Sequence, residues 1–221
     1  NYAPGPCTGG GEISLADAFR VSCNTVFARL GVELGADELI AQAESFGFNR
    51  ALPYDLPAVT SRIPTELDVP ASAQSAIGQR DVRASPLHMA VIAATIANGG
   101  QLLQPHVVAN VRAPDGQVLQ GANDGPWASA GGGARPVSAR TAEQLRQMMI
   151  DAVENGTGRQ AAISGVQVGG KTGTAQAPNG PIAWFIGFAE NDLAIAVMLP
   201  DQEGSTTGGS VAAPIARQVL Q

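Results

Sequence analysis

The chain has 221 residues, of which 44% are hydrophobic and 14% charged, and its formal net charge is −6 at pH 7. This composition predicts one globular domain with a sizeable core and excludes a disordered chain. The acidic balance argues against nucleic acid as a partner, because phosphate binding needs a basic face. The longest apolar runs have about eight residues, whereas a bilayer span needs about 20, so no transmembrane helix is expected.

The first half of the chain predicts helices separated by turns. Ser14 followed by Asp17 is typical of a capping box, and Gly35 and Gly47 are helix stops. Residues 49–69 contain three prolines and no clean period, which indicates an irregular segment. In chain order we expect a loop over residues 1–12 and helices over residues 14–20, 25–34, 37–46, 71–77 and 86–97.

Residues 86–97 form the strongest predicted helix. Ser85 and Pro86 begin it as an N-cap and a first-turn proline. Nearly every residue that follows is apolar, so we expect this helix to be buried all round at the centre of the domain. His88 is then a hydrogen-bonded core histidine rather than a ligand.

The second half of the chain predicts a sheet between helices. Short turns join its last three strands, which are therefore antiparallel, and the last two lack polar alternation, which indicates that both faces are covered. The predicted fold class is α+β, an antiparallel sheet covered by helices on both faces. In order we expect a hairpin over residues 107–112 and 117–120, a loop over 121–135, a helix over 138–154, strands over 168–177, 182–190 and 193–199, and a helix over 209–220.

A glycine-flanked lysine opens the strand block. Gly169-Gly170-Lys171-Thr172-Gly173-Thr174 contains the only lysine of the chain, and on an edge strand Lys171 and Gly173 point to one side and the two threonines to the other. Gly173 has no side chain, so a ligand backbone can approach there. The stretch predicts a cationic edge for an extended, anionic ligand, although a Lys-Thr-Gly triplet alone is more often an ordinary turn or strand end.

A second motif, Ser22-Cys23-Asn24, lies far upstream at the corner between two predicted helices. Taken alone, Ser22 and Asn24 are more simply helix caps. Ser-x-Asn followed by Lys-Thr-Gly, however, gives two of the three elements of penicillin-binding proteins and class A β-lactamases. With Lys171 in the same chain, the chemical interpretation is favoured over capping.

The sequence resembles the transpeptidase domain of penicillin-binding proteins, of class B and similar to the actinobacterial penicillin-binding protein A type. The resemblance covers nearly the whole chain. Besides the two triplets, it rests on residues 15–35 (LADAFRVSCNTVFARLGVELG), 77–90 (IGQRDVRASPLHMA), 155–162 (NGTGRQAA), 183–189 (AWFIGFA) and 212–220 (AAPIARQVL).

One element of that family is absent from the sequence. Its nucleophile lies in a Ser-x-x-Lys motif, but the residue three before Lys171 is Val168. The resemblance therefore implies that residues 1–221 are the C-terminal part of one transpeptidase domain with a serine β-lactamase-like fold. The nucleophile and the first strands of the sheet are expected upstream, and this chain alone is expected to be inactive.

The resemblance also implies roles for the motif residues. Ser22 would relay a proton to the leaving amine, Lys171 would polarise Ser22, and Asn24 would bind the substrate amide. The hydroxyls of Thr172 and Thr174 would bind the terminal carboxylate beside Gly173, and the Thr174 N–H would form one arm of the oxyanion hole.

The expected ligands are peptidoglycan stem peptides ending in D-Ala-D-Ala and the β-lactams that mimic them, and cell-wall synthesis or division proteins are possible partners. The expected location is the extracytoplasmic face of the cell membrane, reached through an N-terminal anchor that this sequence lacks. In that oxidising space an even cysteine count favours a disulfide between Cys7 and Cys23, the alternative being two buried thiols. No metal or other cofactor is expected, since there is no HExxH and no Cys/His cluster.

Two alternatives remain open at this stage. One is a non-catalytic module on the same fold that senses β-lactams or binds the division machinery. The other is a β-lactamase of the same superfamily, against which no loop carrying a deacylating glutamate can be matched.

Overall fold

The computed structural model describes residues 7, 12–121, 135–190 and 192–221, and the predicted loops over 1–12 and 121–135 lie mostly outside them. The helices are α1 (Leu15–Arg20), α2 (Asn24–Leu34), α3 (Ala36–Ser45), α4 (Val69–Ser75), α5 (Pro86–Ala97), α6 (Ala139–Glu154), the 3₁₀ turn η1 (Arg159–Ala161), the π turn η2 (Gly208–Ala212) and α7 (Ala213–Leu220). The strands are β1 (Asn110–Arg112), β2 (Val118–Gly121), β3 (Val168–Ala175), β4 (Ile182–Ala189) and β5 (Leu193–Leu199).

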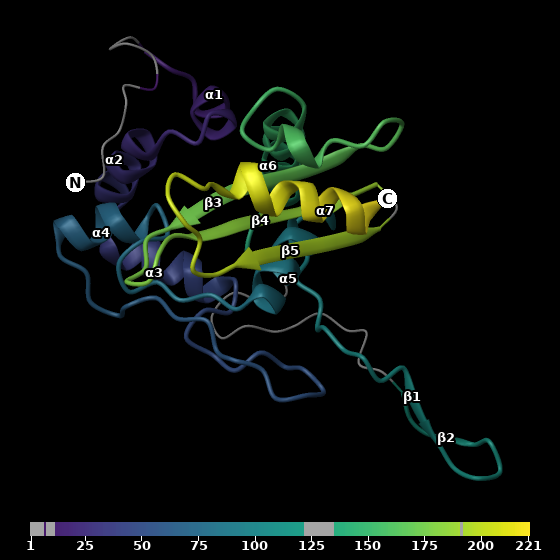
Figure 1. The fold of residues 1–221 in the computed structure, drawn as a ribbon. Helices are drawn as coiled ribbons and strands as arrows, with labels where there is room; N and C mark the ends of the chain where they lie inside the picture. Colours follow the sequence, from purple (N-terminus) through teal and green to yellow (C-terminus); the bar gives the residue numbers. More distant parts are fainter. Residues whose placement is uncertain (1–6, 8–11, 122–134, 191) are drawn as a thin grey trace.

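The main sheet is antiparallel in the order β3-β4-β5, so the Lys171 strand is an edge strand, as predicted. Helix α7 covers one face, and α5 and α6 lie behind the other (Figure 1). This layering follows from the alternation of β4: Phe185 clusters with Ala213 and Ala216 of α7. Phe188 points the other way and clusters with Ile96 of α5 and Met149 of α6. The predicted α+β class with both faces covered is confirmed.

Helix α5 begins and ends as its caps predicted, with the Ser85 hydroxyl accepting from the His88 N–H. His88 is a satisfied core residue: its side chain is buried, its Nε2 lies 2.9 Å from the Phe46 carbonyl oxygen, and its ring lies against Phe48. Burial lowers the pKa of His88. The interpretation of this histidine as a core residue is therefore confirmed.

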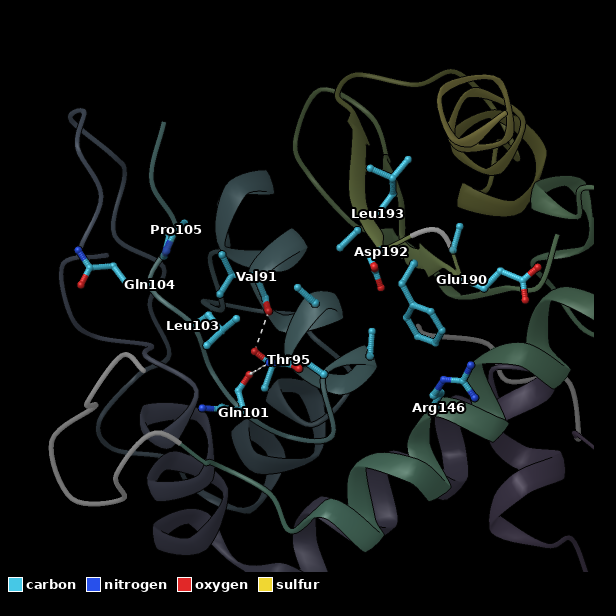
Figure 2. Close-up of a pocket in the computed structure, with 16 residues that line it drawn as sticks. Val91, Thr95, Gln101, Leu103, Gln104, Pro105, Arg146, Glu190, Asp192 and Leu193 are labelled. Atoms are coloured by element: carbon cyan, nitrogen blue, oxygen red, sulfur yellow. Dashed lines mark hydrogen bonds between the residues drawn. The ribbon is translucent and has the colours of Figure 1, made fainter. Parts of the chain in front are cut away.

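The expectation that α5 is buried all round is wrong on one side. A groove of about 520 Å³ runs between α5 and the β4–β5 end of the sheet, with Val91 and Leu103 on one wall and Leu193 on the other (Figure 2). The physical reason is that β5 is the second edge of the sheet. Among the described residues, it pairs with β4 alone, so no strand lies against its outer edge.

The remaining elements differ from the prediction in detail. The predicted closing helix starts as a π turn at Gly208, where a side chain would collide with the carbonyl oxygens of Trp184 and Gly173. Hairpin β1–β2 extends away from the body (Figure 1), and both faces of β1 are exposed. In the part of the chain that the structure describes, no helix is long and apolar enough to cross a membrane.

Candidate active site

The fold brings the two sequence motifs into contact. Lys171 extends from β3 to the corner between α1 and α2, where its Nζ donates to the Ser22 Oγ at 2.7 Å and to the Thr172 carbonyl oxygen at 2.8 Å. Both groups line a pocket of about 470 Å³ along the outer edge of β3. Its walls are formed by Phe19, Ser22, Asn24, Phe27, Ala76, Ile77, Gln79, Thr157, Lys171, Thr172, Gly173, Thr174, Thr207 and Gly209.

The surroundings of Lys171 disfavour its charge. Burial lowers the pKa of Lys171 to about 8, because an ammonium loses hydration in the protein interior. The centroid of the Phe19 ring lies 5.7 Å from Nζ, and this cation–π contact offsets part of the lost hydration of the ammonium. A lysine whose pKa is lowered towards neutrality is suited to general acid–base chemistry.

Ser22 is held at the corner in a rare backbone conformation. Its φ is 56°, a left-handed value that non-glycine residues adopt at an energetic cost, so the surrounding structure must enforce it. Cys23 supplies that restraint: its N–H donates to the Ala18 carbonyl oxygen at 2.8 Å, its side chain is buried, and a disulfide joins it to Cys7. Cys23 is also the N-cap of α2 and makes no side-chain capping bond, so neither Ser22 nor Asn24 has the alternative role of a cap.

The two threonines of β3 lie against elements on the α7 face. The Thr172 hydroxyl lies 2.7 Å from the Thr157 hydroxyl, and the Thr174 hydroxyl accepts from the Gly208 N–H at 3.3 Å. Gly173 lies between the two threonines and lines the pocket. Its lack of a side chain also leaves room for Trp184 on β4, because an added Cβ would lie 3.3 Å from the Trp184 Cβ. The edge is therefore lined by the Lys171 ammonium on one face and by two hydroxyls on the other.

Three residues of this site escaped the sequence reasoning. Gln79 binds the backbone of β3, Thr157 holds Thr172, and Phe19 lies beside Lys171. Each acts through proximity to a segment far away in the chain, and none belongs to a chemical motif. All three did lie in the stretches that carried the family resemblance, which was the one available signal.

Among the described residues, no group of three or more His, Cys, Asp or Glu side chains could hold a metal ion. What the pocket offers is a lysine–serine pair beside a strand edge. Together with the Ser-x-Asn and Lys-Thr-Gly order and the helix-covered antiparallel sheet, this arrangement is typical of the serine enzymes that react with penicillin.

Comparison with known proteins gives the family. The model described as penicillin binding protein transpeptidase domain matches residues 5–221, and the chain belongs to this family. It is 37% identical over 231 residues to the peptidoglycan D,D-transpeptidase PbpA of Mycolicibacterium smegmatis, covering 100% of this chain and 46% of that protein. The chain thus spans about half the length of the curated relatives it matches.

Solved structures agree with this assignment. The imipenem acyl-enzyme complex of penicillin-binding protein A from M. tuberculosis superposes with a TM-score of 0.86 at 37% identity, over 98% of this chain and 49% of that one. The D,D-transpeptidase domain of a peptidoglycan glycosyltransferase from Eggerthella lenta gives a TM-score of 0.80 at 36% identity, over 96% of this chain and 53% of the other. The resemblance read from the motifs is confirmed.

Proposed function

We propose that this chain supplies part of the active site of a peptidoglycan D,D-transpeptidase, an enzyme that cross-links stem peptides through an acyl-enzyme and is the target of β-lactams. The observation that carries the proposal is the 2.7 Å contact between Lys171 Nζ and Ser22 Oγ at the free edge of β3. The names of the mycobacterial relatives and the β-lactam acyl-enzymes of penicillin-binding protein A support it.

The nucleophile of this reaction is proposed to lie outside these residues. The only lysine is Lys171, and Val168 stands where a Ser-x-x-Lys motif would need its serine. Residues 1–221 then form the C-terminal part of one transpeptidase domain, and an upstream segment supplies the attacking serine. The unpaired outer edge of β5 supports this division, since further strands would pair with that edge.

In the first half-reaction, the serine oxygen bonds to the carbonyl carbon of the penultimate D-alanine, and the C–N bond to the terminal D-alanine breaks. The proton of the attacking serine reaches the departing amine through the Ser22 hydroxyl, which is polarised by Lys171 and gives up one proton as it receives another. In the second half-reaction, an amine of a neighbouring stem peptide bonds to the acyl carbon, the ester C–O bond breaks, and the proton that the amine loses returns to the serine oxygen.

Substrate binding is assigned to the edge of β3. The terminal carboxylate lies near the hydroxyls of Thr172 and Thr174 and the ammonium of Lys171, where opposite charge and hydroxyl donors meet. The Asn24 side chain, exposed at the start of α2, binds the substrate amide. The Thr174 N–H stabilises the negative charge that gathers on the carbonyl oxygen.

The location is proposed to be the extracytoplasmic face of the cell membrane, with anchoring outside this chain. The Cys7–Cys23 disulfide supports an oxidising compartment. Cell-wall synthesis or division proteins are the proposed partners.

The test is the intact mass after incubation with penicillin, measured on this chain and on the protein extended upstream through a Ser-x-x-Lys motif. We expect one penicillin adduct on the extended protein and none on this chain. In the extended protein, Ser22→Ala should slow acylation by about 100-fold or more, the range of a lost proton relay. Ser164→Ala, an exposed serine in a turn, is the matched control.

Three other outcomes would contradict the proposal. An adduct on this chain alone would make one of its own residues the nucleophile. Absence of an adduct on the extended protein would leave a non-catalytic module. Rapid hydrolysis of a chromogenic cephalosporin by the extended protein would identify a β-lactamase.

A further inference from the structure

The side chain of Gln79 makes two backbone hydrogen bonds at the end of β3, one to Thr174 in the strand and one to Gln176 just beyond it. Its Nε2 donates to the Thr174 carbonyl oxygen at 3.0 Å, and its Oε1 accepts from the Gln176 N–H at 3.1 Å. Gln79 is only 8% exposed. The carboxamide therefore pairs with this edge as a neighbouring strand would: its N–H donates to the Thr174 carbonyl oxygen and its oxygen accepts from the Gln176 N–H.

The turn that carries Gln79 is unusual on both sides. Gly78 and Arg80 have φ values of 71° and 61°, so two left-handed residues flank the glutamine. Such a conformation costs a non-glycine residue about 1 kcal/mol or more. The Gln79 N–H also donates to the Gln74 carbonyl oxygen at 3.0 Å, which ties the turn back to α4. A strained, anchored turn therefore directs this side chain at the strand.

The contact fixes which way the Thr174 peptide groups face. The N–H and C=O of one residue in an antiparallel strand point to the same side. Because the Thr174 carbonyl points to Gln79 and away from β4, the Thr174 N–H points to the free edge as well. The other outward carbonyl nearby, that of Thr172, is bound by Lys171 Nζ. The edge between them is left with the Thr174 N–H as a donor for a ligand.

We propose that Gln79 is a positioning residue for acylation: its carboxamide holds the outer edge of β3 so that the Thr174 N–H faces the ligand's carbonyl oxygen. The inference rests on the proposed function. Gln79 also sets the end of the binding edge, because its carboxamide occupies the Thr174 carbonyl oxygen and the Gln176 N–H. An extended ligand therefore pairs along β3 no further than this residue.

The chemistry of the amide makes the proposal specific. When penicillin acylates the serine, a bond forms from the serine oxygen to the lactam carbonyl carbon and the ring C–N bond breaks. The serine proton moves to the ring nitrogen, and negative charge passes through the carbonyl oxygen. In Gln79→Glu the carboxylate keeps an acceptor for Gln176 but turns an oxygen towards the Thr174 carbonyl, so the strand edge must shift. In Gln79→Met both hydrogen bonds are lost, while the side chain keeps a similar length.

The experiment uses the protein extended upstream to its nucleophile, with penicillin as the probe. Initial affinity and the first-order acylation constant are separated by varying the penicillin concentration. We expect both Gln79 variants to acylate about 10- to 100-fold more slowly, which is less than the loss of a whole oxyanion donor. We expect the affinity before acylation to change by less than about threefold, because the carboxylate contacts remain. Gln147→Glu, an exposed glutamine on α6, is the matched control.

A second measurement distinguishes a general loss of folding from a local displacement of the β3 edge. Amide exchange at Gln176 should accelerate in Gln79→Met, which loses the acceptor for that N–H, while in both variants the thermal midpoint and the exchange of β4 amides stay near wild type. Wild-type acylation by either variant, or an equal loss in affinity and acylation rate, would overturn the inference while leaving the proposed function intact. If the wild-type protein itself gains no penicillin, the proposed function fails and the positioning role falls with it.

Discussion

Lys171 carries a charge that its surroundings disfavour, and this has a measurable effect on stability. Its pKa is about 8 in the folded protein against an ordinary value of 10.5. Between these two pH values the unfolded chain binds more protons than the folded one, so the free energy of unfolding rises with pH. The stability cost of the buried ammonium is thus complete below pH 8 and disappears as the pH approaches 10.5.

The measurement is urea unfolding of the wild type and of Lys171→Met from pH 7 to 10.5. The difference between the two cancels the titration of all other groups. We expect the free energy of unfolding of the wild type to rise relative to that of the variant as the pH increases across this range. A difference that stays constant with pH would show that the lysine titrates normally.

Sequence reasoning found the residues that carry chemistry in a motif and missed those that act through position. Ser22 and Lys171 were paired because their order matches a family, and the structure brings them into contact across 149 residues of sequence. Gln79 has no reactive group, and its partners in β3 and just beyond it lie 95 and 97 residues away. Only the folded backbone brings that amide to those peptide groups.

At the scale of elements, the junction between η2 and the sheet depends on one glycine. Gly208 lies so close to the carbonyl oxygens of Trp184 and Gly173 that a Cβ has no room, and its N–H binds the Thr174 hydroxyl. We expect Gly208→Ala to destabilise the protein by about 1–3 kcal/mol, the usual cost of overpacking. Loss of the bond to Thr174 should also weaken binding at the edge of β3.

Thermal unfolding checks this prediction, with Gly121→Ala as the control. That glycine ends β2 and has nothing within 4 Å of an added Cβ. Equal thermal midpoints for Gly208→Ala and Gly121→Ala would show that η2 shifts to accommodate the added methyl group without loss of stability.

The elements were predictable where local chemistry defines them. Ser85-Pro86 and Ser138 begin α5 and α6, and short turns made the last three strands antiparallel. The open side of α5 was not predictable, because an apolar sequence does not tell which neighbour covers each side. The π turn at Gly208 follows from a backbone contact to β3 and β4 that no local pattern encodes.

At the scale of the whole molecule, the Cys7–Cys23 disulfide ties the start of the chain to the corner that holds Ser22. Its two cysteines are separated by 16 residues, and closing a loop of that size stabilises a protein by about 3 kcal/mol on the chain-entropy model. We expect reduction to lower the free energy of unfolding by about this amount.

Urea unfolding with and without reductant measures the effect, and the Cys7→Ser, Cys23→Ser double variant is the control, since reductant should leave it unchanged. An unaltered wild-type midpoint after complete reduction would contradict the prediction. A lower midpoint in reductant would show that the disulfide stabilises the fold.

The solitary lysine has a further consequence for chemical labelling. Amine-directed reagents react with the neutral amine, and at a pKa of about 8 Lys171 presents it at mild pH. Besides the α-amino group, it is the one amine that the sequence offers. A reagent small enough to enter the pocket would therefore leave a single side-chain tag at the edge of β3, and protection from tagging would report occupancy of that edge by any unlabelled ligand.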